Sequence, residues 1–278
     1  MVLYTFAPRV RKKQEQGKRV RVKDILTALE SFAPLSLQDD FDNAGLQIGS
    51  VDGEVSGVLL CLDVTPEVIE EAVKEGCSVV VSHHPLLFKS LRRVSDETMV
   101  EKCVRLAVKN DVTVYSAHTN LDNADGGVNF EIARRLDLQN VSFLSPSHYG
   151  VGGSGVIGEL AEKEDSRSFL LRVKQVFGVE RLMCNGTLSR PIRRVALCGG
   201  AGDFLLEKAI SAGADCFLTG EVHYHVYFGH EEQIQIAAIG HYESEQYTVD
   251  LLARRLQKLF PELMVKKTKI NTNPIQYL

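Results

Sequence analysis

Two stretches of sequence decide the fold: VLLCLDVTPEVIEEAVKEGCSVVVS at residues 58–82 and VALCGGAGDFLLEKAISAGADCFLT at residues 195–219. They form a weak internal repeat at an offset of 137 residues. The matched pairs are Cys61 with Cys198, Ala72 with Ala209, Gly76 with Gly213 and Ser82 with Thr219. Each copy has the pattern of an apolar strand, a helix that stops at a glycine, and a second apolar strand. Continuous apolar strands indicate burial on both faces and therefore predict a parallel βαβ unit in each copy.

The repeat continues beyond each βαβ unit. A further apolar strand ends at His118 in the first half and at His241 in the second, and each histidine has an acid four residues later, Asp122 or Glu245. Tandem α/β halves that present polar residues at the carboxyl ends of their strands are the arrangement in which open sheets place binding sites. Because a duplication can also be purely architectural, the repeat locates a site without naming its chemistry.

The chain divides into a basic extension at residues 1–21, a first α/β lobe at 22–144 and a second at 145–278. Residues 145–158, rich in Gly and Ser, suit a connection between the lobes. The C-terminal segment of the second lobe is a candidate to pack back on the first. Apolar residues at helical spacing predict helices over 22–32, 96–110, 127–136 and 248–259.

Composition excludes several classes of protein. A net charge of −4 and a pI near 6.1 predict no general attraction to nucleic acid or to anionic lipid. The apolar runs are too short for a membrane span, and no signal peptide is evident. The six cysteines never form C-x-x-C, which is typical of reduced, structural thiols and predicts a cytoplasmic protein. Residues 1–21 carry seven basic residues against one acid, Glu15, and a solvated, disordered extension is favoured over a nucleic-acid-binding arm.

Five side chains are candidate metal ligands. His83 and His84 follow a buried strand, and a His pair alone is more often a hydrogen-bonded turn. Asp122 lies close to the end of the next strand, and His241 and Glu245 share one face of a helix. Three imidazoles and two carboxylates exceed the needs of one tetrahedral zinc and suit two ions about 3.5–4 Å apart. The sequence therefore predicts two divalent transition-metal ions per chain, either Zn, Fe or Mn.

Neighbouring acids and histidines receive other interpretations. Asp125 is expected to cap the helix that comes after it, and Glu243 is expected to face solvent. Glu221 and His223 follow the strand of the second repeat, at the place that His83 and His84 occupy in the first. They are candidates for acid/base or substrate contacts in the same cleft, with a structural role about equally expected.

Four segments in combination resemble one known family. They are Asp42-Asn43-Ala44-Gly45-Leu46-Gln47-Ile48-Gly49, Ser82-His83-His84-Pro85, His118-Thr119-Asn120-Leu121-Asp122, and Gly240-His241 with Glu245. The chain resembles the GTP cyclohydrolase 1 type 2 homologues, also described as dinuclear metal centre proteins, from residue 22 to 278. Phe41 stands where that family often has Trp, a departure without chemical consequence.

The resemblance carries specific expectations for the site and the assembly. It implies metal ligation by His83, His84, Asp122, His241 and Glu245. It places His118 close to the metals without binding them. It also implies an intertwined pair of α/β lobes, with the metal site in the cleft between them, and a ring-shaped homohexamer. Longer relatives insert an extra domain between the halves, and this chain is too short to hold one. The resemblance does not settle the reaction.

A glycine-rich segment allows two interpretations. Residues 150–155, GVGGSG, could cradle a phosphate through backbone N–H groups. The next segment, 156–160, has the pattern of a strand rather than a helix. A flexible hairpin or linker is therefore favoured.

Two functions remain open from the sequence. The first is a metal-dependent hydrolase in which a hydroxide bridging the metals attacks a nucleotide-like or phosphorylated small molecule, with His118, Glu221 and His223 as candidate proton carriers. The family name suggests a guanine nucleotide. The alternative is a non-catalytic metal-binding or regulatory protein that engages a macromolecular partner. The sequence carries no Ser/His/Asp triad signature and no P-loop.

Overall fold

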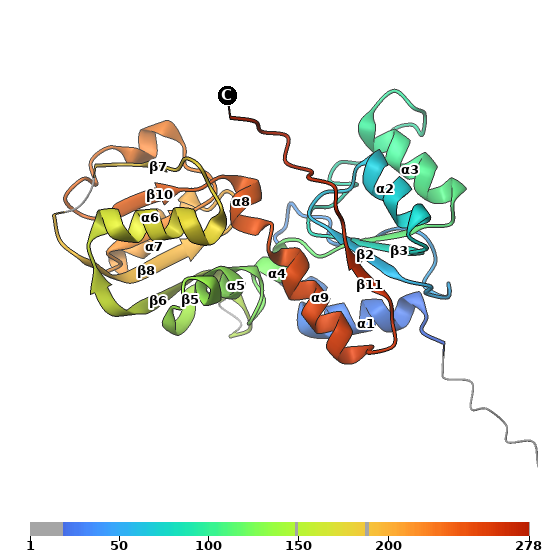
Figure 1. Ribbon diagram of the computed structural model, residues 1–278, viewed down its shortest axis with the longest axis horizontal. Coiled ribbons are helices and arrows are strands. Elements are labelled where there is room, and N and C mark those ends of the chain that lie inside the picture. Colours follow the sequence, from blue (N-terminus) through green and yellow to red (C-terminus); the bar gives the residue numbers. More distant parts are fainter. Residues whose placement is uncertain (1–18, 148–149, 187–188, 278) are drawn as a thin grey trace, which may run out of the picture.

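The computed structural model describes residues 19–147, 150–186 and 189–277. They fold into two α/β lobes that lie side by side, each built on its own mixed sheet (Figure 1). Most of the predicted basic extension, residues 1–18, lies outside the described residues, and Arg19 forms an ion pair with Glu54 at 2.8 Å. Among the described helices, none is long and apolar enough to cross a membrane.

The first sheet has the strand order β1-β4-β3-β2-β11, with β1 antiparallel to β4 and the other neighbours parallel. Its strands are β1 Gly45–Ile48, β2 Val58–Cys61, β3 Val79–Ser82, β4 Thr113–Ser116 and β11 Val265–Lys267. The helices around it are α1 Val22–Phe32, η1 Leu35–Leu37, α2 Pro66–Lys74, α3 Met99–Lys109, α4 Thr119–Asp122 and α9 Thr248–Leu259.

The second sheet has the order β5-β6-β8-β9-β10-β7, in which only β8, β9 and β10 run parallel to one another. Its strands are β5 Gln139–Pro146, β6 Gly153–Glu164, β7 Met183–Cys184, β8 Ile192–Cys198, β9 Cys216–Thr219 and β10 Gln235–Ala238. Its helices are α5 Val128–Arg135, α6 Ser166–Phe177, η2 Asp203–Leu205, α7 Leu206–Ser211, η3 Tyr224–Tyr227 and α8 His241–Glu245.

The two copies of the sequence repeat form the same βαβ unit. In the first copy β2 runs parallel to β3, and in the second β8 runs parallel to β9. The registers are equivalent, since Cys61 lies opposite Ser82 and Cys198 lies opposite Thr219. Local signals explain the helix ends: Thr65 caps α2 by accepting from the Val68 N–H, and Gly76 follows that helix with φ +74°.

Several predicted helices are confirmed, and their ends have identifiable causes. The helices α1 and α9 coincide with the predicted ranges 22–32 and 248–259. The helix α3 begins at Met99 rather than at residue 96 because Thr98 and Glu101 form a capping box there. The helix α5 begins after Gly127 without a side-chain cap, so the capping role expected for Asp125 is wrong.

The chain crosses between the sheets in both directions. Strand β5, whose residues fall largely in the range assigned to the first lobe, pairs with β6 in the second sheet. Residues 150–155 therefore lie in a β-hairpin, and the strand expected at 156–160 is part of β6. After α8, helix α9 leads back to the first lobe, where β11 adds to β2 at the edge of the sheet (Figure 1).

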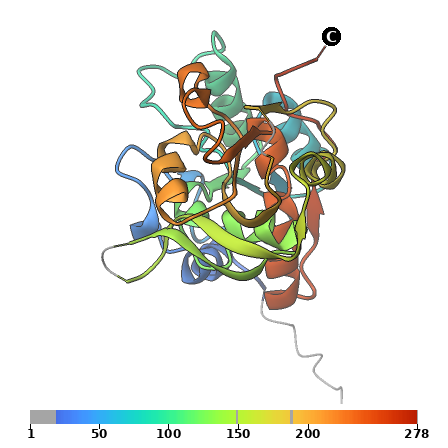
Figure 2. The same cartoon turned by 90° about the vertical axis from the view of Figure 1, so that its left-hand side faces the viewer.

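A continuous apolar core ties the two lobes together. On the first sheet, Val58 and Leu60 of β2 face this shared core, together with α1 and α9, while Leu59 and Cys61 face α2 and α3. The second sheet repeats this alternation, with α6 on the shared side and α7 on the other (Figure 2). Because helices cover both faces of each sheet, the central strands are apolar on both faces.

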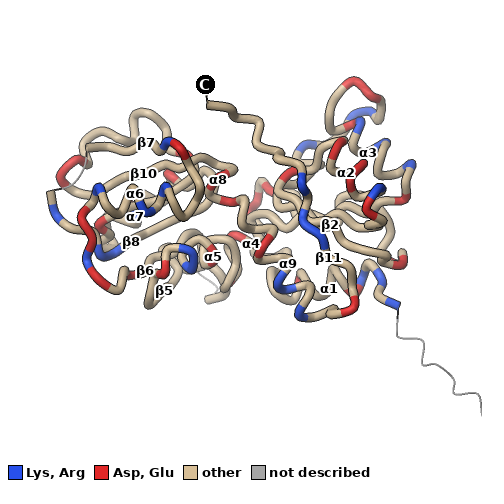
Figure 3. The backbone as a smooth tube through the Cα atoms, viewed as in Figure 1, with Lys and Arg blue, Asp and Glu red and all other residues tan. Residues whose placement is uncertain are grey.

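Charged residues of both signs are interspersed over the two lobes (Figure 3). A basic stretch runs along β11 and the residues after it, but its lysines are paired. Lys266 and Lys269 contact Glu75, and Lys267 contacts Asp250 at 2.8 Å. This stretch therefore serves to fix the C-terminal segment on the first lobe.

Candidate metal centre

The candidate ligands come from the carboxyl ends of strands in both sheets. His83 and His84 directly follow β3, and His118 follows β4 and precedes α4. Asp122 is the last residue of α4, and the pair His241 and Glu245 begins and ends α8, which follows β10. The structure thus brings all of the predicted ligand positions to the facing edges of the two lobes.

Glu245 lies at the centre of the cluster. Its Oε2 lies 3.0 Å from His84 Nε2, 3.2 Å from His241 Nε2 and 3.6 Å from His83 Nε2. His83 Nε2 also lies 3.6 Å from Asp122 Oδ1. The ligand atoms form three overlapping groups, each within 4.8 Å: His83 with His84 and His118; His84 with His241 and Glu245; His83 with Asp122 and Glu245.

Each of the four imidazoles uses its Nδ1 on a protein oxygen. The pairs are His83 with the carbonyl of Ala117 (2.7 Å), His84 with Asp63 (2.7 Å), His118 with Asp42 (2.7 Å) and His241 with Glu221 (3.2 Å). An oxygen on one ring nitrogen fixes the orientation of the ring and leaves the other nitrogen for a metal. Asp63 lies two residues beyond the end of β2; the sequence shows this position near a strand end, and only the fold shows its contact with His84.

Two buried polar atoms of the cluster lack hydrogen-bond partners among the described residues. The His83 side chain is fully buried, and its Nε2 and the Oδ1 of Asp122 have no hydrogen-bond partner among the described residues. A buried polar atom without a partner is costly, so native proteins rarely keep one without a function. Nitrogen and carboxylate donors of this kind suit Zn, Fe or Mn. The residues therefore fit a metal site.

Opposite charges within the cluster shift the pKa values of its members. Burial alone would lower the pKa of His84, but hydrogen bonds to Asp63 and Glu245 raise it to about 10. Burial alone would raise the pKa of Glu245, but the surrounding imidazoles lower it well below its ordinary value. Burial raises the pKa of Asp122 to about 6 against the opposing charge of His83. Protons on the imidazoles thus supply positive charge that offsets the carboxylates, and bound metal cations would supply the same charge.

The structure changes the interpretation of several neighbours. His118 belongs to one of the ligand groups, whereas the sequence placed it beside the metals. Glu221 supports His241. His223 points away: its side chain is 86% exposed and forms a 2.5 Å pair with Asp203. Glu243 does not simply face solvent, because its Oε1 accepts a hydrogen bond from Asn273 at 2.9 Å.

A glycine loop lets the backbone of the second lobe approach Glu245. Gly200 has φ +61°, and a Cβ on it would lie 2.5 Å from Glu245 Oε1 and 3.3 Å from His241 Nε2. The preceding Gly199 donates its N–H to Asn129 at 2.9 Å, which ties the loop to α5. The close approach of these glycines to the candidate ligands is evident only from the fold.

A cavity of about 210 Å³ opens beside the cluster. Its wall contains His118, Asp122, His241 and Glu245, with residues from both lobes. On the other side of His84 and His241 lies a cavity of about 180 Å³, which the C-terminal segment helps to enclose. There Thr272 donates to Asp63 Oδ2 at 2.7 Å, so the segment supports the carboxylate that orients His84.

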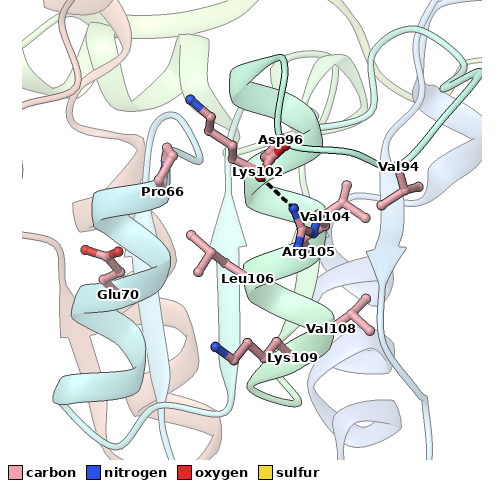
Figure 4. Close-up of a pocket in the computed structure, with 10 residues that line it drawn as sticks. All are labelled: Pro66, Glu70, Val94, Asp96, Lys102, Val104, Arg105, Leu106, Val108 and Lys109. Carbon is pink, nitrogen blue, oxygen red and sulfur yellow. Dashed lines mark ion pairs between the residues drawn. The ribbon is translucent and has the colours of Figure 1, made fainter.

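A larger hollow of about 800 Å³ lies elsewhere, between α2 and α3 on the outer face of the first lobe (Figure 4). Its wall is mainly apolar and also contains charged groups, among them the ion pair between Arg105 and Asp96 (Figure 4). None of the candidate ligands is among its lining residues in the described chain. This groove is therefore separate from the candidate metal centre.

Comparison with known proteins places the chain in a family. The family model described as Duf34/NIF3 (NGG1p interacting factor 3) matches residues 20–274. The chain belongs to this family. A relative from Clostridium acetobutylicum, named GTP cyclohydrolase 1 type 2 homolog, is 34% identical over 242 residues, which cover 86% of this chain and 90% of the relative. The resemblance seen in the sequence is thus confirmed over most of the chain.

Two solved structures share this fold. Staphylococcus aureus hypothetical protein SA1388 superposes with a TM-score of 0.88 at 27% identity, covering 94% of this chain and all of that one (100%). A Bacillus cereus protein related to NIF3 superposes with a TM-score of 0.84 at 25% identity and covers 94% and 100% of the two chains. The two-lobed architecture is therefore common to this chain and these relatives.

Proposed function

We propose that this protein is a metal-dependent hydrolase that acts on a nucleotide-like small molecule in the cleft between its lobes. The observation that carries the proposal is the set of four imidazoles, each fixed through Nδ1 by a protein oxygen and gathered around Glu245. A cavity of about 210 Å³ opens directly beside them. A site that serves only to hold a metal is usually closed, whereas a catalytic site keeps access to solvent and substrate.

The proposed ligands are His83, His84, His118, Asp122, His241 and Glu245, and we propose two divalent ions, either Zn, Fe or Mn. When bound, such ions supply the means of ionising a water molecule near neutral pH. The chain's own residues orient the ligands and hold protons. Asp63 and Asp42 fix the rings of His84 and His118, and Glu221 fixes that of His241.

Proton transfer requires groups that reach the cleft. His118 lines the cavity of about 210 Å³, and Glu221 lines the cavity on the other side of His241. Glu221 stays in the proposed machinery as a proton carrier. His118 stays in it as a ligand, because a ring with one nitrogen on Asp42 and the other on a metal has none left to move a proton. His223 is left out, because its exposed ring pairs with Asp203 and lies outside the lining of both cavities in the described chain.

The test is a screen of the metal-loaded protein against nucleosides, nucleotides, phosphodiesters and cyclic amidines, with two matched variants. His84→Ala removes a ring at the centre and should abolish turnover. His223→Ala removes an exposed ring of the same type and should leave turnover within about threefold, as expected for a surface substitution. A chelator should stop the reaction and added metal should restore it.

The same screen can reject the proposal. If the two variants retain equal turnover, the activity belongs to a contaminant. If the metal-replete protein hydrolyses nothing, the alternative function, a metal-binding or regulatory protein with a macromolecular partner, takes precedence. Retention of full activity in the presence of a strong chelator would exclude a metal-dependent reaction.

We also propose the homohexamer that the family resemblance implies. Exposed apolar side chains beside the groove of α2 and α3 support an interaction surface on the outer face of the first lobe: Val108 is 66% exposed and Val94 58%. Light scattering at micromolar concentration should give the mass of six chains. A monomer would contradict the proposal.

A further inference from the structure

The cavity beside the metal cluster adjoins a second compartment. The inner cavity, of about 210 Å³, and an outer one of about 420 Å³ share Asp39, Asn123 and Ser154 in their walls. Asp39, Asn123 and Ser154 therefore stand at the boundary between the two compartments, where they can contact a ligand from either side. The two compartments together have the size of a small-molecule site rather than of a site for water or a simple ion.

Two exposed aromatic rings border the inner compartment, one from each lobe. Phe41 precedes β1, and Phe204 lies in η2. Each is 66% exposed, which is high for a large apolar side chain in the wall of a cavity. The Phe41 ring packs edge-on against Phe88 at 6.4 Å, and Phe88 in turn contacts the ring of His118 at 6.2 Å. Exposed aromatic faces beside a cavity suit stacking with a planar ring.

The outer compartment is polar and carries more acids than bases. Among its described lining residues, Asp39 and Asp40 are acidic and Lys208 is basic, and Lys208 already donates to Ser145. The inner compartment has no Lys or Arg among its described lining residues, so its positive charge would come from the proposed metal ions, and the outer compartment has Lys208 alone to face the phosphates of a longer ligand. Sites for triphosphates need several cationic groups or a cradle of backbone N–H groups. Carboxylate side chains instead accept hydrogen bonds from hydroxyl groups, and amide side chains can both accept such bonds and donate them.

Asp39 is held in place at the junction of the compartments. Its backbone N–H donates to Thr119 Oγ1 at 2.9 Å, and Asn123 Nδ2 donates to its Oδ1 at 3.3 Å. Asn123 also donates to the carbonyl of Leu37 at 2.9 Å, so the amide is fixed from two sides. A fixed carboxylate at this place can select a ligand with hydrogen-bond donors next to its ring.

We propose that the cleft binds a nucleoside or a nucleoside monophosphate, with its planar ring against Phe41 and Phe204 and its hydroxylated part beside Asp39 and Asp40, and that it discriminates against a triphosphate. This inference rests on the proposed function, because it names the substrate class of the same site. Binding of such a ligand can be measured separately from its hydrolysis.

The experiment is calorimetric titration of the zinc-loaded, full-length protein with the four common ribonucleosides and their mono- and triphosphates. At least one nucleoside should bind. Its monophosphate should bind with similar affinity, and its triphosphate at least about tenfold more weakly, because like charges face each other in the outer compartment. Ribose 5-phosphate, which lacks the ring, should bind more weakly than the nucleoside monophosphate.

Matched variants test the role of each group. Phe41→Ala and Phe204→Ala should each weaken nucleoside binding about tenfold, the usual effect of losing one stacking ring. Phe228→Ala removes a ring that is 56% exposed in the second lobe but outside the described lining of either compartment, and it should have no effect. Asp40→Lys should strengthen triphosphate binding relative to the nucleoside. Elemental analysis should show unchanged metal content in all four variants.

Several results would overturn the inference. They are a triphosphate that binds more tightly than its nucleoside, the absence of binding by all four nucleosides, and Phe204→Ala binding like the parent protein. A change of oligomeric state in the Phe variants with unchanged binding would assign these rings to a subunit interface instead. Nucleoside binding without hydrolysis would reject the proposed hydrolase but support the proposed binding site. Hydrolysis of a ligand without a ring would support the hydrolase but reject the binding site.

Discussion

The two copies of the βαβ repeat share a backbone and differ in the residues that come after their last strand. In the first lobe β3 leads into His83 and His84, whereas in the second β9 leads into Gly220 and Glu221. A Cβ on Gly220 would lie 2.5 Å from the carbonyl oxygen of Gly200, so this position demands a residue without a side chain. The first copy supplies nitrogen donors. The second lets its backbone approach closely and presents a supporting carboxylate.

This difference shows how a duplicated framework can build an asymmetric site. The first lobe provides most of the imidazoles, and each is held by an oxygen from that lobe. The second lobe provides Glu245, whose Oε2 contacts rings from both lobes. The first lobe therefore determines the type of donor, and the second determines whether the donors form one centre.

The largest effect should come from removing the carboxylate that joins the lobes. Glu245→Ala should lose both metal ions, because Glu245 belongs to two of the three ligand groups and lies 3.0 Å from His84 Nε2. Elemental analysis after loading with Zn, Mn or Fe measures the loss. Glu243→Ala removes the neighbouring acid on α8, which contacts Asn273 instead, and should keep both ions. Full metal occupancy in Glu245→Ala would contradict the conclusion that the second lobe's carboxylate joins the donors of the two lobes.

A smaller loss should result from Asp122→Ala. Asp122 has an unpartnered Oδ1 that faces His83 at 3.6 Å, so its removal should cost one ion. Asp125→Ala is the control three residues later: it caps no helix and should change the free energy of unfolding by less than about 0.5 kcal/mol and keep both ions. Equal metal loss in the two variants would contradict the assignment.

Protons and metal ions should compete for the same site. The pKa of His84 is raised to about 10, so in the metal-free protein its imidazole is protonated at pH 7 and must lose that proton to bind a metal. Metal affinity should therefore rise with pH, by about tenfold per unit for each proton released. Titration of the metal-free protein with zinc in a weak buffer at pH 7 should release protons. Zinc uptake without proton release would contradict a His84 imidazole that is held in its protonated form by hydrogen bonds to Asp63 and Glu245.

The smallest effect concerns the glycine loop of the second lobe. Gly200→Ala should weaken metal binding about 10- to 100-fold, since the new Cβ would lie 2.5 Å from Glu245 Oε1. Gly213→Ala is a matched control, because Gly213 has a similar φ of +70° but nothing within 4 Å of a Cβ. Both variants carry backbone strain, and only Gly200→Ala should change metal affinity. Equal affinities would show that the close approach is unimportant.

The sequence predicted the elements whose signals are local. Apolar periodicity with Pro and Gly stops located α1, α9 and both βαβ units, and strand ends located the candidate ligands. It did not predict that β5 joins the second sheet. The hairpin of β5 and β6 is local, but its place in that sheet depends on the pairing of β6 with β8, which is distant in sequence. For the same reason the outward direction of His223 and the support of His84 by Asp63 emerged only from the fold.

The most direct test of the joint site is metal analysis of the loaded protein with one variant from each lobe. We expect about two ions per chain in the parent protein, and the loss of at least one ion both in His83→Ala of the first lobe and in His241→Ala of the second. Anomalous diffraction from crystals of the parent should place the ions between these two side chains. One ion or none in the parent after loading, or full occupancy in His241→Ala, would contradict a dinuclear centre shared by the lobes.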